Sequence, residues 1–165
     1  MKNRHCTSHN PIGETIVELA VLLLVIGTVV FTLMTFPKLP ETVPTHIGVK
    51  GQVDGFGSKR ILLAMPIMGL VFYIGLSILQ RFPDKFNYPV EVTDNNAEVL
   101  HLLGVKLARC IKLFVVLITS FGTCEFIELA KGRYLKFGIA VIAWLVALMM
   151  VMVFYYIIKM MRQKE

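Results

Sequence analysis

Long stretches of apolar residues with almost no charged side chains constrain the fold of this chain more than any other feature. Three of them run from Ile16 to Phe36, from Ile61 to Gln80 and from Phe137 to Ile158. The first is 21 residues long, and roughly 20 apolar residues let a helix cross ~30 Å of hydrocarbon. A helix on the surface of a soluble protein is apolar only along one stripe. These stretches therefore predict membrane-spanning helices.

A further stretch is interrupted by charge. Its uncharged run from Leu113 to Cys124 has only 12 residues, which is too short to cross a bilayer without its flanks. We predict one long helix from about 96 to 130, which begins at the membrane interface and then enters the bilayer. Three cations at a spacing of three share one face of this helix and are expected to reach lipid headgroups. They are Lys106, Arg109 and Lys112.

Polar side chains near two helix starts support specific predictions. Asp94 or Asn95 is expected to cap the helix that begins near residue 96, and Glu98 stands three residues after Asn95, as in a capping box. Glu14 and Glu18 are one turn apart at the start of the first span. Glu18 either faces a bundle interior as an ionisable functional residue or reaches the cytoplasmic interface, and its shallow depth favours the interface.

The sequence thus predicts an all-α polytopic membrane protein with four transmembrane helices, forming a single domain over residues 1–165. We expect a structured loop between the first and second helices and an interfacial start to the third. Ten Lys and Arg residues lie on the side of the two termini and seven on the other side. The positive-inside rule therefore places both termini in the cytoplasm. The net charge is +6, but the Lys and Arg residues form no basic stripe interleaved with aromatic residues. The positive charge therefore indicates contact with lipid headgroups and not with nucleic acid.

The loop from 37 to 60, between the first two spans, is unusually rich in residues that shape a backbone. It contains three prolines and four glycines, which respectively fix φ and permit close backbone approach. The pair Asp54-Gly55 is a tight-turn signal. A loop of 24 residues with this composition is expected to be folded and functional.

The motif in this loop resembles the family known as domain of unknown function 1648, a module shared with SdpI-type bacterial immunity proteins. The resemblance rests on Leu39-Pro40…Pro44-Thr45-His46…Gly51-Gln52-Val53-Asp54-Gly55-Phe56-Gly57-Ser58-Lys59, just after a first membrane helix. A second similar stretch is Phe86-Asn87-Tyr88-Pro89…Thr93-Asp94-Asn95-Asn96-Ala97. The family usually has Trp after the His, where this chain has Ile47.

The resemblance implies a bacterial plasma-membrane protein with cytoplasmic termini and the motif loop outside. SdpI-type members protect their producer from a secreted toxic protein, and some hold a transcriptional repressor at the membrane. We therefore expect the loop to bind a secreted toxin or peptide, or to hold a partner membrane protein, and we expect a membrane or cytoplasmic regulator as a second kind of partner. The expected partner-binding residues, all in the motif loop, are Pro40, Pro44, His46, Gly51, Asp54, Gly55, Gly57, Ser58 and Lys59. The second motif adds a separate set of candidate site residues, Tyr88, Pro89, Thr93, Asn96 and Ala97.

Two interpretations of the chemical side chains in and near this loop remain open. His46 and Asp54 are good Zn²⁺ ligands by type, and Glu125 and Glu128 are expected at the same face of the membrane, around one vestibule. Alternatively, His46 caps or hydrogen-bonds the loop, Asp54 forms its turn, and the two glutamates pair with Lys131 or Arg133. The second interpretation is favoured, because no metal-ligand spacing is present.

These observations predict a protein without catalytic residues, cofactor or metal. Ser58 has no positioned base around it, and Cys6, Cys110 and Cys124 lack metal or disulfide spacing. The leading hypothesis is a non-enzymatic membrane protein of the immunity or sensing type. A small permease or transport accessory subunit is the alternative, against which the scarcity of polar groups in the spans argues. An enzyme ranks third.

Overall fold

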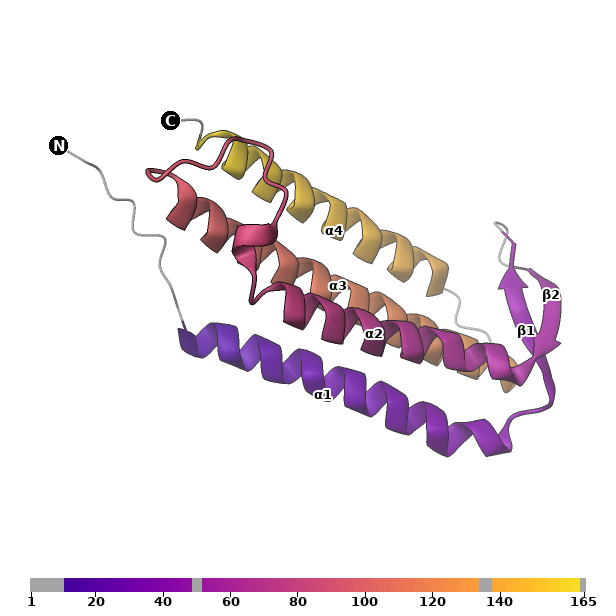
Figure 1. Ribbon diagram of the computed structural model, residues 1–165. Coiled ribbons are helices and arrows are strands. Elements are labelled where there is room, and N and C mark those ends of the chain that lie inside the picture. The colour runs from indigo at the N-terminus through magenta and orange to yellow at the C-terminus, as the bar shows by residue number, and fades with distance from the viewer. Residues whose placement is uncertain (1–10, 49–51, 134–137, 164–165) are drawn as a thin grey trace.

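Four long helices dominate the computed structural model, which describes residues 11–48, 52–133 and 138–163. They lie side by side in alternating directions, so the start of α1 and the end of α4 are at the same end of the bundle (Figure 1). The helices are α1 (Pro11–Thr35), α2 (Ala64–Leu79), α3 (Ala97–Ala130) and α4 (Gly138–Met161). Short 3₁₀ helices, η1 (Phe36–Lys38), η2 (Lys59–Leu63) and η3 (Pro83–Lys85), flank α1 and α2.

Three helical segments are long and apolar enough to cross a membrane: Ile12–Lys38, Lys59–Leu79 and Gly138–Met161. They coincide closely with the three uninterrupted stretches predicted from the sequence. Their large apolar side chains are widely exposed, including Leu23 at 67% and Trp144 at 70%. A water-soluble monomer rarely exposes contiguous apolar surface of this extent, so the fold is that of a helical membrane protein.

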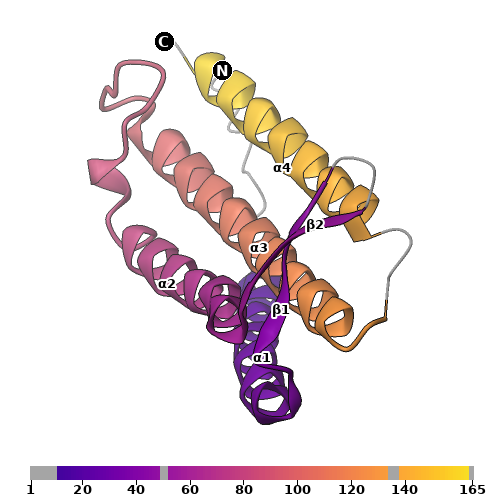
Figure 2. The ribbon, with the colours of Figure 1, turned by 90° about the vertical axis from the view of Figure 1, so that its right-hand side faces the viewer.

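The third long helix, α3, is continuous from Ala97 to Ala130, as the sequence predicts. It lies in the centre of the bundle and packs against α1, α2 and α4 (Figure 2). It is not among the apolar segments above. The predicted capping box is wrong, because Asn96 takes the N-cap position and its side chain makes no capping hydrogen bond.

The segment between α1 and α2 corrects the expectation of an all-α protein, because it forms an antiparallel hairpin of two strands. These are β1 (Thr42–Ile47) and β2 (Val53–Ser58), which pair Val43 with Gly57 and Pro44 with Phe56 before an irregularity shifts the register. Prolines and β-branched residues disfavour a helix here, and pairing the strands satisfies their backbone groups.

Asp54 and Gly55 lie inside strand β2, so the prediction of a tight turn at this pair is wrong. Gly48 N–H donates to the carbonyl of Gln52 at 2.8 Å, so Gly48 and Gln52 are still paired just beyond the ends of the two strands. The residues between them, 49–51, lie outside the described part of the chain. The expected site residue Gly51 is one of them.

Three clusters of buried apolar side chains hold the bundle together at different levels. The hairpin end contains Leu39, Val43, Leu62, Ile127 and Ala130. The middle contains Val21, Val25 and Val116, and the end with the termini contains Leu100, Leu103 and Met160. The first cluster joins β1 to η2 and α3, so the hairpin is fixed to the bundle by its core.

Candidate functional site

The hairpin brings His46 and Asp54 together at its surface. The imidazole Nδ1 of His46 and a carboxylate oxygen of Asp54 form a hydrogen bond, and the two side chains are 70% and 43% exposed. The sequence predicted that His46 hydrogen-bonds the loop. The pair comes from opposite strands and spans the irregularity in their register, so it also holds the two strands together at that point.

The glycines of β2 allow β1 to approach closely. A Cβ at Gly57 would lie 3.0 Å from the Thr45 Cγ2 atom, and one at Gly55 would lie 3.0 Å from the His46 Cβ atom. These distances are shorter than most carbon–carbon approaches in proteins. The exposed residues of β2 alternate with these positions, as Asp54, Phe56 and Ser58, so the outward face of the hairpin is polar with one large ring at its centre.

Lys59 anchors the hairpin to the end of α1. Its ammonium pairs with Glu41 at 2.9 Å, donates to the Leu39 carbonyl at 3.3 Å and lies 5.1 Å from the centre of the Phe36 ring. Its side chain is only 13% exposed. Lys59 is therefore a positioning residue for the hairpin, with little surface of its own to offer a partner.

The two glutamates predicted around a vestibule, Glu125 and Glu128, do not contact His46 or Asp54 of the hairpin. Glu128 pairs with Lys131 at 2.8 Å and Arg133 at 2.6 Å, as the second interpretation predicts. Among the described residues, no ion pair or hydrogen bond joins either glutamate to His46 or Asp54. Nor does any group of three or more His, Cys, Asp or Glu within the described ranges have a geometry suited to a metal ion.

Glu125 takes a different place from the one predicted for it. Its side chain is buried against Gly138 at the start of α4, where a Cβ would overlap its carboxyl group. One carboxyl oxygen, Oε2, has no hydrogen-bond partner. Glycine at position 138 therefore makes room for a carboxyl group between α3 and α4, and the predicted pairing of Glu125 with Lys131 or Arg133 is wrong.

A cluster of charged side chains lies inside the half of the bundle that is farther from the hairpin. Lys112 is 1% exposed, and its ammonium contacts Glu18 at 2.5 Å and the Ser77 hydroxyl at 3.0 Å. Arg109 contacts Glu14 at 3.0 Å and Glu18 at 3.2 Å. Two carboxylates of α1 thus neutralise two cations of α3.

This cluster corrects two expectations. Lys112 does not face headgroups. Arg109 is only 19% exposed, and its guanidinium pairs with the carboxylates of Glu14 and Glu18. Glu18 faces the interior, contrary to the favoured interpretation. The physical reason is that a charge at this depth is stabilised better by an opposite charge on the neighbouring helix than by snorkelling. Lys106 is half-buried and has no ion pair with a described residue, so its contact with headgroups stays a prediction.

The second motif folds the connection between α2 and α3 onto α3. The Tyr88 hydroxyl donates to the Pro83 carbonyl at 2.8 Å, and its ring stacks on His101. A Cβ at Gly104 would lie 2.7 Å from the Phe86 ring and 2.8 Å from the Tyr88 hydroxyl. Burial, with a smaller effect of the Asp84 charge, raises the pKa of Tyr88 to about 12, so the phenol remains a hydrogen-bond donor at neutral pH.

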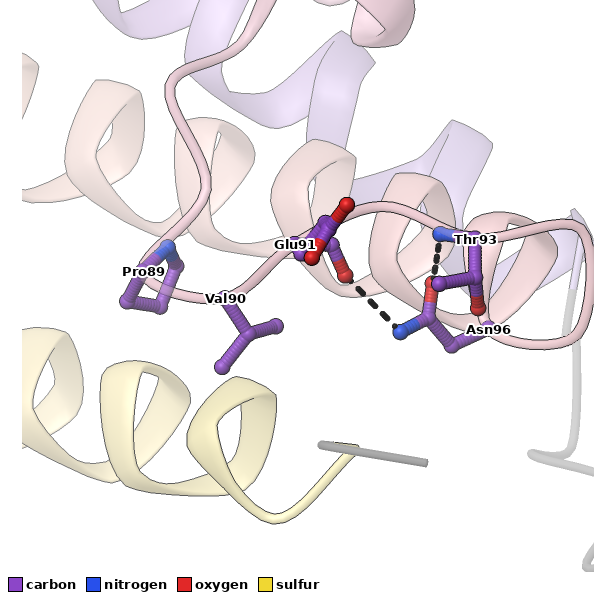
Figure 3. A pocket seen from close by; sticks show the side chains of 5 residues that line it. All are labelled: Pro89, Val90, Glu91, Thr93 and Asn96. Carbon is purple, nitrogen blue, oxygen red and sulfur yellow. Dashed lines mark hydrogen bonds between the residues drawn. The ribbon is translucent and has the colours of Figure 1, made fainter.

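The rest of this motif surrounds a shallow hollow of about 260 Å³, lined by Pro89, Val90, Glu91, Thr93 and Asn96 (Figure 3). The Asn96 amide accepts a hydrogen bond from Thr93 N–H and donates to the carbonyls of Glu91 and Gln163. Asn96 thereby ties the connection to the end of the chain after α4. Ala97 only begins α3. The second motif is thus structural in its contacts and lies at the opposite end of the bundle from the hairpin.

Glu14, Glu18, Ser77 and Phe56 are the residues that the sequence did not place in a site. A signal existed for the charged ones: Glu14 and Glu18 are spaced by four, and Arg109 and Lys112 by three, so each pair lies on one helix face. What the sequence lacked was any indication that the two faces oppose each other.

Comparison with known proteins gives a family but no activity. Residues 23–70 match the profile of the family described as Domain of unknown function (DUF1648). An uncharacterized protein of Archaeoglobus fulgidus is 36% identical over an alignment of 67 residues, and the alignment covers 36% of this chain and 37% of the relative. The match therefore spans little more than a third of that relative's length. No solved structure matches the chain. The segment from the middle of α1, through the hairpin, to the first turns of α2 thus matches the DUF1648 family, as its motif residues predict.

Proposed function

We propose that this chain is a non-enzymatic multi-pass membrane protein of the immunity or sensing type, and that its hairpin engages a secreted or membrane partner. One observation carries the proposal. The residues of the family motif form a hairpin that is fixed to the bundle by Val43 and Lys59, while His46, Asp54 and Phe56 remain exposed. A surface that is both preorganised and exposed suits recognition, because little ordering entropy is lost on binding.

The proposal includes α3 as the fourth transmembrane helix. It lies among three apolar helices and packs against all of them, so it shares their depth in the bilayer. Its inner cations are neutralised by Glu14 and Glu18, which lowers the cost of burying them. With four spans, the hairpin projects from one face of a plasma membrane, and both termini lie on the cytoplasmic face.

The surface around the termini is the proposed contact for headgroups or a soluble regulator. The cations available there are fewer than the sequence suggested, because Arg109 and Lys112 pair within the bundle. Arg81 and Lys85 are exposed in the connection before α3. Each such cation near an anionic bilayer contributes about 1 kcal/mol to membrane attraction.

A transport role is the second candidate, and the buried charges favour it. Lys112 and Glu18 lie inside the bundle, and farther along the same interface the Thr28 hydroxyl donates to Ser120 at 2.8 Å. Ionisable groups within membrane helices often mark ion or proton pathways. Between these polar levels, however, Val21, Val25 and Val116 form an apolar cluster. Proton and solute uptake into vesicles containing the purified protein would distinguish this role from recognition.

The test of the leading proposal is photo-crosslinking in the native host from position 56, where a benzoylphenylalanine replaces a Phe that is 68% exposed. Two matched controls carry the same probe at Phe82, at the opposite end of the bundle and 45% exposed, and at Trp144, on the apolar face of α4. We expect position 56 to capture one discrete protein that neither control captures, and His46→Ala or Asp54→Asn to weaken this capture. Capture of lipid or nothing from position 56 under several growth conditions would contradict the proposal.

A further inference from the structure

The hydrogen bonds of the hairpin show which backbone groups face outward. Lys59 N–H donates to the Glu41 carbonyl at 2.9 Å, so these opposite residues form a hydrogen-bonded pair. In an antiparallel ladder such pairs alternate with non-hydrogen-bonded ones. Following the observed register, Val43 and Gly57 are hydrogen-bonded, whereas Pro44 and Phe56 are not. The N–H and C=O of Phe56 therefore point away from β1, toward the outer edge of β2.

The two edges of the hairpin differ. On β1, the residue at the outward position opposite Phe56 is Pro44, which has no N–H to donate. Strand β1 is also the one that packs against α3 and η2, with Val43 completely buried. Proline at an edge and cover by neighbouring elements are the usual means of blocking strand addition.

The edge of β2 has neither protection. Among the described residues, no helix packs against β2 as α3 packs against β1. Within this part of the chain, β2 also makes no backbone hydrogen bond outside the hairpin ladder. A sheet of only two strands is marginally stable by itself, so a third strand would add hydrogen bonds and stability. The exposed Phe56 ring stands at the centre of this open edge.

We propose that the outer edge of β2 accepts an extended segment of the partner protein as a third strand. This inference rests on the proposed function and specifies its mode of recognition. Backbone hydrogen bonds at Phe56 supply affinity for any extended peptide, and side chains supply selectivity. The preferred segment has an apolar residue where it meets the Phe56 ring, with polar residues two positions before and after it, because Asp54 and Ser58 flank the ring on the same face.

The test uses linear peptides selected from a random phage-displayed library against the protein in lipid nanodiscs. At position 56, phenyllactic acid replaces the outward N–H by oxygen and retains the ring. We expect this variant to bind the selected peptides roughly tenfold more weakly, because the hydrogen bond is lost and the new ester oxygen repels the carbonyl oxygen of the peptide. The matched control is the corresponding hydroxy acid at Thr42, whose N–H lies on the outward edge of β1, and its peptide affinity should be unchanged.

Hydrogen exchange at position 56 tests the third-strand mode independently of the hydroxy-acid variants. Peptide binding should slow hydrogen exchange of the Phe56 amide. The Phe56→Ala variant retains the backbone amide at position 56, so a peptide that binds this variant should slow exchange of that amide as well. Equal affinity of the phenyllactic acid variant and the parent protein would overturn the third-strand mode, as would loss of binding in the Thr42 variant or failure to select any peptide. Crosslinking from position 56 would remain positive in those cases if the hairpin recognises its partner by side chains alone, so the two proposals fail separately.

Discussion

At the scale of single residues, Lys112 shows how a charge is accommodated inside this bundle. Its side chain is almost wholly buried near the middle of α3, and it meets Glu18, Ser77 and the face of the Tyr73 ring. All three neighbours favour an ammonium ion. An uncompensated charge at this place would be costly, so the pair with Glu18 links the stability of α1 to that of α3.

We predict that Lys112→Met lowers the free energy of unfolding by about 2–3 kcal/mol, because it leaves Glu18 with Arg109 as its remaining partner. Glu18→Gln should have a comparable effect, and the double variant should lose less than the sum of the two. Denaturant titration of the purified protein in detergent measures these values. Lys106→Met is the control, since Lys106 is half-buried without an ion pair to a described residue. Additive losses would show that the two side chains are not coupled.

At the scale of elements, close packing decides how the connection between α2 and α3 is placed. Phe86 and Tyr88 lie directly over Gly104 of α3, and Tyr88 is held in place by Pro83 and His101. The interface of α1 is built differently. Its buried residues Val21, Val25, Thr28, Thr32 and Thr35 alternate at spacings of four and three, the pattern of helices that pack at a shallow angle.

Gly104→Leu is predicted to lower the free energy of unfolding by about 2–3 kcal/mol, because the new side chain would displace the Phe86 and Tyr88 rings. Gly75→Leu is its matched control, as a helical glycine of α2 with nothing within 4 Å of a Cβ. This control should be neutral or slightly stabilising, since leucine is the better helix former. Thermal unfolding in detergent compares the two. If both variants behaved alike, the aromatic packing on Gly104 would not fix the connection.

At the scale of the whole molecule, the alternation of four helices places the hairpin at one end and both the start of α1 and the end of α4 at the other (Figure 1). The ion pairs between α1 and α3 lie in the half nearer the termini, whereas the hairpin is anchored at the other end by Leu39, Val43 and Ile127. This arrangement separates the proposed recognition surface from the proposed cytoplasmic surface by the thickness of the bilayer.

The orientation can be measured with single cysteines introduced at Gln52 and Asn87, two exposed residues at opposite ends of the bundle. The background has Cys6, Cys110 and Cys124 replaced by serine. A membrane-impermeant maleimide applied to intact cells should label position 52 only, and both positions should react after permeabilisation. Labelling of position 87 alone would establish the inverse orientation, and labelling of both in intact cells would exclude a bilayer between them.

Much of the architecture was predictable because a membrane-spanning helix is recognised from the hydrophobicity of one continuous stretch of sequence. The apolar segments Ile12–Lys38, Lys59–Leu79 and Gly138–Met161 nearly coincide with the predicted spans, and α3 was predicted as one helix. The motif residues also sufficed to predict the match of residues 23–70 to the DUF1648 family. In each case the relevant information lies within a short stretch of chain.

The sequence by itself thus determined the number and position of the long helices, and a folded loop between the first two. Only the tertiary structure decided the strand register, which puts Asp54 and Gly55 inside β2 instead of in a turn. It also decided the partners of charged groups: Lys112 and Glu18 are 94 residues apart in the chain, and Glu125 is buried against Gly138. Such pairings depend on which helix faces oppose each other, and that choice is made by the packing of the whole bundle.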